Sequence, residues 1–247
     1  MQTPRFRLAL ILLALGTAGI LSLLTTDIPL SPETEALLRE RFSPFQIKLL
    51  LTINPFLFLL TGVTAGILLY RRVGYSLPLL EKLAGAKFIA FSPGSVVKAG
   101  ITGGIGAALI LRAIDFLWTS RIPSELLQAS NPNMAVRLLY GGFTEEITVR
   151  FGWMTFITWL IYKLTGKLNA FTYWAAIITT AILFGAAHLP AAVQLTGGLR
   201  PEITAYVVGA NAAAGIIFGY LYWRHGLEAA ILAHMTAHIL LFITEYF

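Results

Sequence analysis

Long apolar segments separated by short polar ones dominate the chain. A membrane-spanning helix needs about 20 mainly apolar residues, and seven segments come near this length. The pattern therefore predicts an all-α fold, a polytopic transmembrane helix bundle with about seven spans, with six or eight as the alternatives. The expected spans are residues 7–25, 47–70, 96–118, 135–162, 171–188, 203–223 and 227–244.

The segment between the first two expected spans is more polar. Residues 31–42 predict a short amphipathic helix at the membrane surface, with Ser31 and Pro32 as its N-cap and first turn and Glu35 behind them. A removable signal peptide is the alternative for the first apolar segment, but no small-x-small cleavage pattern follows it. Without an internal repeat or low-complexity linker, residues 1–247 are expected to form a single membrane domain.

Composition agrees with a lipid-facing surface. Hydrophobic residues make up 57% of the chain and charged residues only 12%, whereas soluble domains carry about 25% charged residues. The net charge of +6 does not indicate a nucleic-acid partner, because the basic residues lie at the ends of apolar segments. The absence of cysteine excludes disulfides, thiolate catalysis and cysteine-ligated metals.

The basic residues also predict an orientation, because short cytoplasmic loops are enriched in Lys and Arg. With a cytoplasmic N-terminus, one side of the membrane receives Arg5, Arg7, Arg71, Arg72, Lys82, Lys87, Lys98, Lys163, Lys167 and Arg224. The other side receives fewer, and several acids dilute them. We therefore expect an integral, multi-pass membrane protein whose N-terminus is cytoplasmic and whose C-terminus is not.

Ionisable residues inside spans are costly and mark functional or paired groups. Glu146 and Arg150 stand four apart in the favourable order for an ion pair on one helix. Glu145 points about 100° away from Glu146 on an α-helix, so its partner must come from another helix or from water. Arg112 and Asp115, three apart, are interpreted as a local pair near the membrane edge without a catalytic role.

Histidines provide candidate partners for Glu145. His188, His234 and His238 all lie in spans or at their ends, and Asn211 lies in the sixth span. In the seven-span arrangement, Glu145 and these four residues come to neighbouring depths, nearer the end of the bundle opposite the basic loops. A polar cluster assembled from four helices is therefore expected.

These residues resemble four motifs of the CAAX protease and bacteriocin-processing family, also called CPBP or ABI. Residues 145–150 (EEITVR) match its EExxxR motif, and residues 184–188 (FGAAH) match FxxxH. Asn211, before Gly215 and Gly219, is similar to the third motif. Residues 234–238 (HMTAH) stand where the family has His-xxx-Asn or a variant, so His238 replaces the asparagine of the prenyl-protein members.

The resemblance implies an intramembrane glutamic endopeptidase that needs no cofactor and cleaves a membrane-associated peptide or protein, CAAX-type or otherwise. It is expected to act in the plasma membrane of a prokaryote. The catalytic core would be residues 135–247. Glu145 would activate water with the help of His188, His234 and His238 would stabilise the oxyanion, and Glu146 and Arg150, with Asn211, would support the site.

Two alternatives remain open. Glu145, His188, His234 and His238 could ligate zinc in a metalloprotease, although the chain has no HExxH motif. The polar cluster could instead stabilise a non-catalytic membrane scaffold or regulator, because family resemblance does not establish activity. In addition, the predicted orientation places the cluster away from the cytoplasmic face, where a prenylated substrate would lie.

Overall fold

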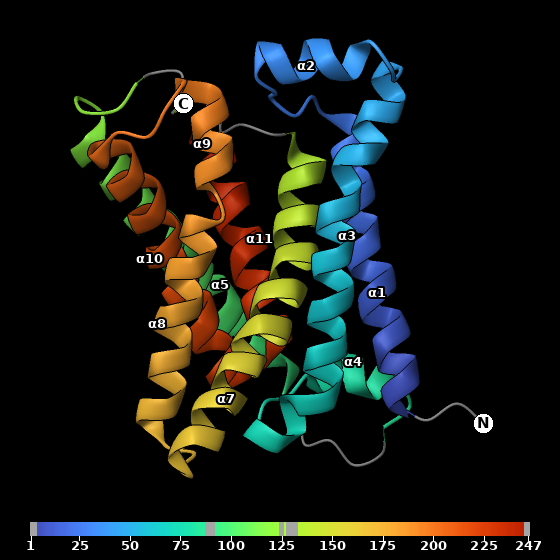
Figure 1. Cartoon of the computed structure of the whole chain (residues 1–247). Helices are drawn as coiled ribbons and strands as arrows, with labels where there is room; N and C mark the ends of the chain where they lie inside the picture. The colour runs from blue at the N-terminus through green and yellow to red at the C-terminus, as the bar shows by residue number, and fades with distance from the viewer. Residues whose placement is uncertain (1–3, 87–91, 124–125, 127–132, 245–247) are drawn as a thin grey trace.

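A computed structural model describes residues 4–86, 92–123, 126 and 133–244. Most of the described residues are helical, and the long helices run back and forth along the length of the bundle (Figure 1). The helices that do so are α1 (Pro4–Ser22), α3 (Pro44–Leu69), α5 (Pro93–Trp118), the continuous pair η3 (Val136–Met154) and α7 (Thr155–Thr165), α8 (Ala170–Ala186), α10 (Pro201–His225) and α11 (Leu227–Ile243). The expected membrane bundle is confirmed.

Five segments are long and apolar enough to cross a membrane by themselves; they are Pro4–Thr25, Pro44–Val73, Pro93–Trp118, Ala170–Thr196 and Pro201–His225. Two further traverses differ from these five. The last helix, α11, is apolar but only 17 residues long, and the η3–α7 pair carries the charged residues of the site. In η3 and α11, neighbouring helices cover the charged and histidine side chains of the site.

Short helices cap the two ends of the bundle. α2 (Pro32–Arg39) lies across one end and α4 (Pro78–Leu83) at the other (Figure 1). Ser31 caps α2 as expected, accepting a hydrogen bond from the Thr34 backbone N–H at 3.3 Å. Glu35 does not take part in this cap, contrary to expectation, because its carboxylate pairs with Arg39 at 2.6 Å. The sequence pattern did not indicate α4.

The smaller connecting elements are also helical. η1 (Leu23–Thr25) and η2 (Tyr70–Val73) are single 3₁₀ turns that end α1 and α3, and α9 (Leu189–Thr196) extends the direction of α8. Lys87, which was counted among the basic loop residues, lies outside the described residues.

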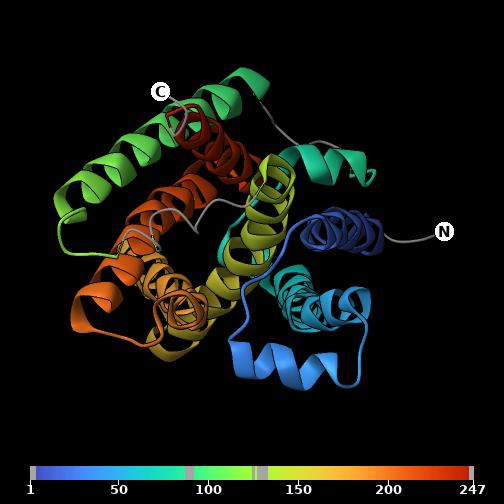
Figure 2. The ribbon, with the colours of Figure 1, turned by 90° about the horizontal axis from the view of Figure 1, so that it is seen from above.

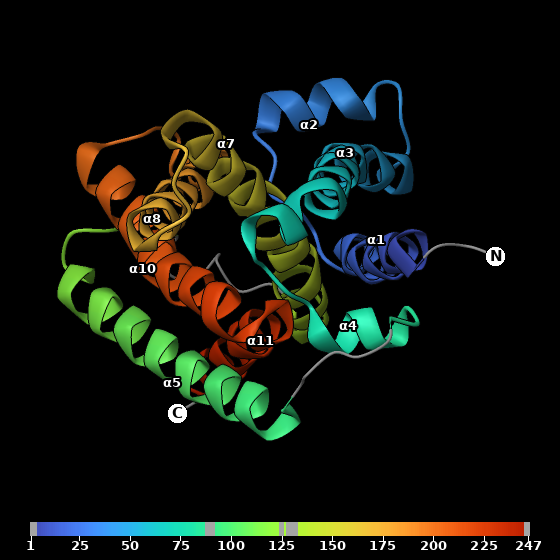
Figure 3. The same ribbon diagram turned by 90° about the horizontal axis from the view of Figure 1, so that it is seen from below.

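The central helix is η3. Seen from above, it stands in the middle, with α1 and α3 on one side and α8, α10 and α11 on the other (Figure 2). α5 packs outside α10 and α11, as the view from below also shows (Figure 3). Because η3 is enclosed on both sides, charged side chains on it meet protein rather than lipid.

η3 is wound as a π-helix rather than the α-helix expected for this span. A π-helix closes its backbone hydrogen bonds between residues five apart, and such segments often occur at functional sites. The wider turn changes which residues share a face. Positions four and five apart on η3 point in similar directions, which determines the side chains that reach the functional site.

Small residues allow the helices around η3 to approach closely. A Cβ atom built on Gly152 would lie 2.5 Å from the Cα of Gly62 on α3, and one on Gly62 would lie 3.1 Å from the Thr148 carbonyl oxygen. A Cβ built on Gly104 of α5 would likewise lie 2.5 Å from the Ala233 carbonyl oxygen of α11. Backbone-to-backbone contacts of this kind drive helix association where lipid surrounds the bundle.

The Gly152–Gly62 contact predicts the effect of a single methyl group. Gly152→Ala would push η3 away from α3, because backbone atoms cannot move aside as a flexible side chain can. We expect a loss of about 1–3 kcal/mol of stability, the usual cost of overpacking, measured by thermal unfolding in detergent. Gly106→Ala is the matched control, since a Cβ there meets nothing within 4 Å. Equal stability of both variants would contradict this packing.

Candidate active site

The second carboxylate of the acidic pair, Glu146, is fully buried between two partners. Its Oε1 lies 2.9 Å from Nδ1 of His234 on α11, and its Oε2 lies 3.5 Å from Nε of Arg150 one turn along η3. An ionised carboxylate only accepts hydrogen bonds, so the hydrogen of this bond is on Nδ1 of His234. Glu146 therefore fixes the orientation of the His234 ring as well as pairing with Arg150.

Arg150 balances the charge of Glu146. It is 1% exposed, and none of its guanidinium nitrogens has a hydrogen-bond partner among the described residues. The guanidinium instead lies 5.0 Å above the ring centre of Phe184 on α8, a cation–π contact, and near Gly215 of α10. The expected Glu146–Arg150 ion pair is confirmed. Through the Arg150 guanidinium, η3 also contacts α8 and α10.

Glu145 points away from this pair and into a cavity. Its Oε2 lies 3.9 Å from Nε2 of His234, the ring nitrogen that Glu146 leaves available. Electrostatic interactions also connect Glu145 with His188. A polar contact of 3.9 Å is too long for a direct hydrogen bond, but one water molecule with contacts of about 2.8 Å could bridge the two groups. The partner of Glu145 thus comes from another helix, as the sequence indicated.

His188 stands where α8 ends and α9 begins. Its Nδ1 lies 2.8 Å from the Phe184 carbonyl oxygen, and its ring meets the Phe184 ring edge-on at 4.7 Å. A carbonyl oxygen only accepts, so the hydrogen is on Nδ1, and Nε2 of the neutral ring keeps a lone pair. The break between α8 and α9 turns this histidine toward the cavity.

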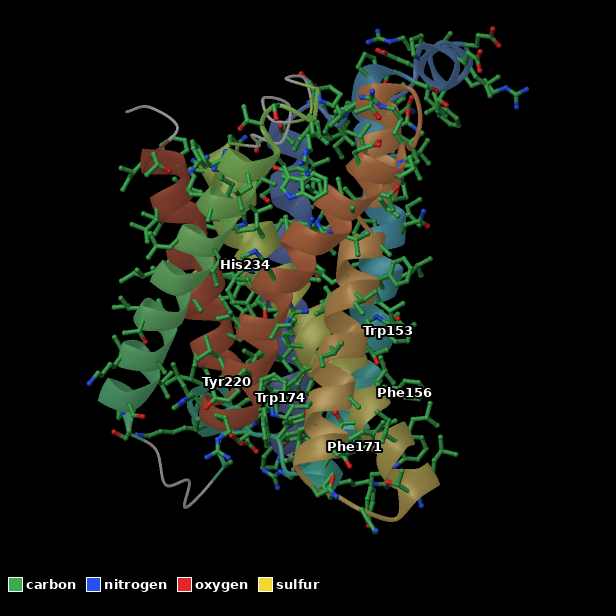
Figure 4. The ribbon with its side chains drawn as sticks, turned by 90° about the vertical axis from the view of Figure 1, so that its left-hand side faces the viewer. Trp153, Phe156, Phe171, Trp174, Tyr220 and His234 are labelled. Carbon is green, nitrogen blue, oxygen red and sulfur yellow. The ribbon has the colours of Figure 1, made fainter. Side chains whose placement is uncertain are left out.

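His238 stacks on His234. The two rings lie 4.8 Å apart at 21°, and Phe218 of α10 covers the other face of His234 at 4.7 Å. This sandwich holds both imidazoles in α11 at a fixed angle. Figure 4 shows His234 inside the bundle, while Trp153, Phe156 and Phe171 lie at its periphery.

A cavity of about 660 Å³ brings these groups together. Its wall includes Glu145, His188, Asn211, His234 and His238, five of the seven residues expected in the site. Glu146 and Arg150 are not in the wall and lie behind it. Asn211 donates from Nδ2 to the Val207 carbonyl oxygen of its own helix at 2.8 Å, and within the described residues it makes no hydrogen bond to a histidine.

Several wall residues were not expected there. Tyr140 and Arg137 precede Glu145 by five and eight residues, and the π winding of η3 brings them to its face. Arg112 and Asp115 form the local pair anticipated from their spacing, at 3.4 Å, but they also line the cavity, where Tyr206 donates to Asp115 at 2.7 Å. An α-helical projection of the sequence could not have placed Tyr140 beside Glu145.

The side chains do not form an evident metal-ligand group. Within the part of the chain that the structure describes, no three His, Asp or Glu side chains are arranged as a set that could hold a metal ion. Nδ1 of His234 lies against Glu146 and Nδ1 of His188 lies against a carbonyl oxygen, so Nε2 of each ring is outside these two hydrogen bonds.

Part of the chain is similar to a known protein family. A family model described as type II CAAX prenyl endopeptidase Rce1-like matches residues 128–240. Residues 128–240 are therefore similar to the Rce1-like family. The matched stretch contains every residue of the expected site, from Glu145 to His238, and the family implies a membrane peptidase. No curated protein and no solved structure matches the chain.

The Rce1-like region contains a glycine whose size is critical for the site. A Cβ on Gly141 would lie 2.8 Å from Nε2 of His238 and 3.4 Å from Nε2 of His234. Gly141→Ala is expected to displace the stacked rings and reduce kcat by about tenfold or more, because small misplacements of reacting groups are costly. The measurement compares turnover and thermal stability with those of Gly209→Ala, where a Cβ meets nothing. Unchanged turnover in Gly141→Ala would contradict the site geometry.

Proposed function

We propose that the chain is an intramembrane endopeptidase of the glutamic type, which hydrolyses a peptide bond of a membrane-associated substrate. The observation that carries this proposal is the separation of roles on one helix. Glu145 faces the cavity and His188, whereas Glu146, its neighbour, is buried behind the wall and holds His234. The Rce1-like match supports the class of reaction, and a CAAX-type prenylated protein is the substrate class that the family name suggests.

Water activation is assigned to Glu145 with His188. A water molecule in the cavity donates one hydrogen to the Glu145 carboxylate and is held by the Nε2 lone pair of His188. As its oxygen attacks the scissile carbonyl carbon, the proton passes to this pair. A positioned acid–base group of this kind contributes about 100- to 10,000-fold in rate. Glu145 then returns the proton to the amine nitrogen as the carbon–nitrogen bond breaks.

Oxyanion stabilisation is assigned to His234 and His238. With Nδ1 donating to Glu146, a protonated His234 donates from Nε2 to the oxygen that becomes negative in the tetrahedral intermediate. His238, stacked on the same ring, supplies another N–H. Donors held in advance at such a position are each worth about 100- to 1,000-fold in rate.

Asn211 and the wall beyond it would bind the substrate rather than react. Most of the lining is apolar, including Leu111, Phe184, Val207, Ala214 and Phe218. Cavities of about 300–1,000 Å³ hold drug-sized ligands, so this one can hold a short extended segment of peptide. Removal of water from the surroundings by such a segment would strengthen the electrostatic interactions that the mechanism needs.

Glu145→Gln tests the proposal, because the amide keeps the shape of the side chain but cannot take a proton. We expect turnover of a cleavable membrane peptide to fall at least about 100-fold, with thermal stability unchanged, because the contact of Glu145 with His234 at 3.9 Å is too long for a direct hydrogen bond. Glu202→Gln, an exposed carboxylate at the start of α10, is the matched control and should keep full activity.

Two outcomes of the same assay would contradict the proposal. Retained turnover in Glu145→Gln would remove the glutamic mechanism, and a collapse of the fold would favour the non-catalytic scaffold. The wild-type protein is also washed with a chelator, and activity is expected to remain. Activity that disappears on chelation and returns with one equivalent of zinc would establish the metalloprotease instead.

A further inference from the structure

The cavity opens at one end of the bundle and reaches about halfway along its length. Its deepest wall residues, Phe218 and His234, lie midway along α10 and α11. Its outer residues belong to the end that α2 covers: Pro29 lies between α1 and α2, Thr119 directly follows α5, and Leu195 lies near the end of α9. The mouth is therefore at the end of the bundle where the C-terminal helix also finishes (Figure 1).

Basic residues concentrate at the other end. They lie where α1, α5 and α8 begin and where α3, α7 and α10 finish, and only two acids accompany them, Glu81 and Glu228. The nine described ones are Arg5, Arg7, Arg71, Arg72, Lys82, Lys98, Lys163, Lys167 and Arg224. We call this the basic end.

The mouth end has a different balance. Six described basic residues lie in its helix ends and connections, namely Arg39, Arg41, Lys48, Arg121, Arg137 and Arg200, together with five acids, namely Asp27, Glu33, Glu35, Glu40 and Glu202. Ion pairs join Arg39 with Glu35 at 2.6 Å and Lys48 with Asp27 at 2.8 Å.

The aromatic residues show that the basic end lies at a membrane surface. Trp174 stacks on Tyr220 there, Trp223 meets both rings edge-on, and Arg224 lies 5.3 Å from the Trp223 ring centre. Figure 4 shows Trp174 and Tyr220 toward that end of the bundle. Tryptophan and tyrosine gather at the membrane–water boundary, and short loops rich in Lys and Arg remain in the cytoplasm. The basic end is thus the cytoplasmic one.

The positions of the cavity mouth and of the basic end indicate from which side a substrate enters, and this inference rests on the proposed peptidase function. We infer that the active-site cavity opens to the non-cytoplasmic side of the membrane, so that its substrate is a peptide segment presented from that side. An exported or membrane-anchored peptide with an apolar stretch fits this position. A prenylated C-terminus does not, because the prenyl group of a CAAX sequence anchors a protein to the membrane from the cytoplasm.

Single cysteines test the orientation directly, because the native chain has none. Leu199 and Leu168 form a matched pair: both are exposed leucines in connections between helices, at the mouth end and the basic end respectively. Ala191, exposed and in the cavity wall, reports the mouth itself. Each variant is expressed in bacterial cells and treated with a membrane-impermeant maleimide before and after permeabilisation.

We expect Leu199→Cys and Ala191→Cys to be labelled in intact cells and Leu168→Cys only after permeabilisation. Labelling of Leu168→Cys in intact cells, or protection of the other two until permeabilisation, would overturn the inference. The labelling does not depend on catalysis, so it remains informative even if Glu145→Gln shows that the proposed function is wrong. If the orientation is right and the function holds, sealed right-side-out vesicles should cleave an added impermeant peptide and inverted ones should not.

Discussion

The structure depends on neutralising charges that the bundle has removed from water. Glu146 and Arg150 are almost completely buried within a fold whose outer surface is apolar. Taking an ion out of water costs several kcal/mol unless another charge or hydrogen bond compensates. Glu146 meets this requirement with Arg150 on its own helix and His234 on α11. These contacts stabilise η3 in the membrane. They also set the direction of Glu145, which precedes Glu146 in the sequence.

This constraint explains how a helix enclosed between its neighbours can organise a reaction site. Gly152 and Gly62 bring η3 against α3 on one side, and the Glu146–His234 hydrogen bond ties it to α11 on the other. Two histidines with different Nδ1 partners then face one cavity, His188 with a carbonyl and His234 with a carboxylate. The His234 bond ties α11 to η3, whereas the His188 bond is local to the end of α8.

Much of the fold could be predicted from the sequence because hydropathy and the Lys/Arg pattern are properties of single segments. The traverses, the Glu146–Arg150 pair and the gathering of Glu145 with the histidines follow from such patterns. The bond from Glu146 to His234, 88 residues away, could not be predicted, because it depends on packing between helices. The π winding of η3, and with it the position of Tyr140 in the wall, likewise has no signature in residue spacing. Arg112 and Asp115 were recognised as a pair, but their place in the cavity depends on how α5 lies against α10 and α11.

The central claim is that Glu146 acts through His234, and a double-mutant cycle on kcat/KM measures this coupling most directly. Glu146→Gln and His234→Asn are prepared singly and together, with thermal stability recorded for each. If Glu146 acts through His234, the kcat/KM of the double variant should be no lower than that of the less active single variant, since either change already breaks the same hydrogen bond. Losses that simply multiply would mean that the two side chains act independently, and the account of the site would be wrong.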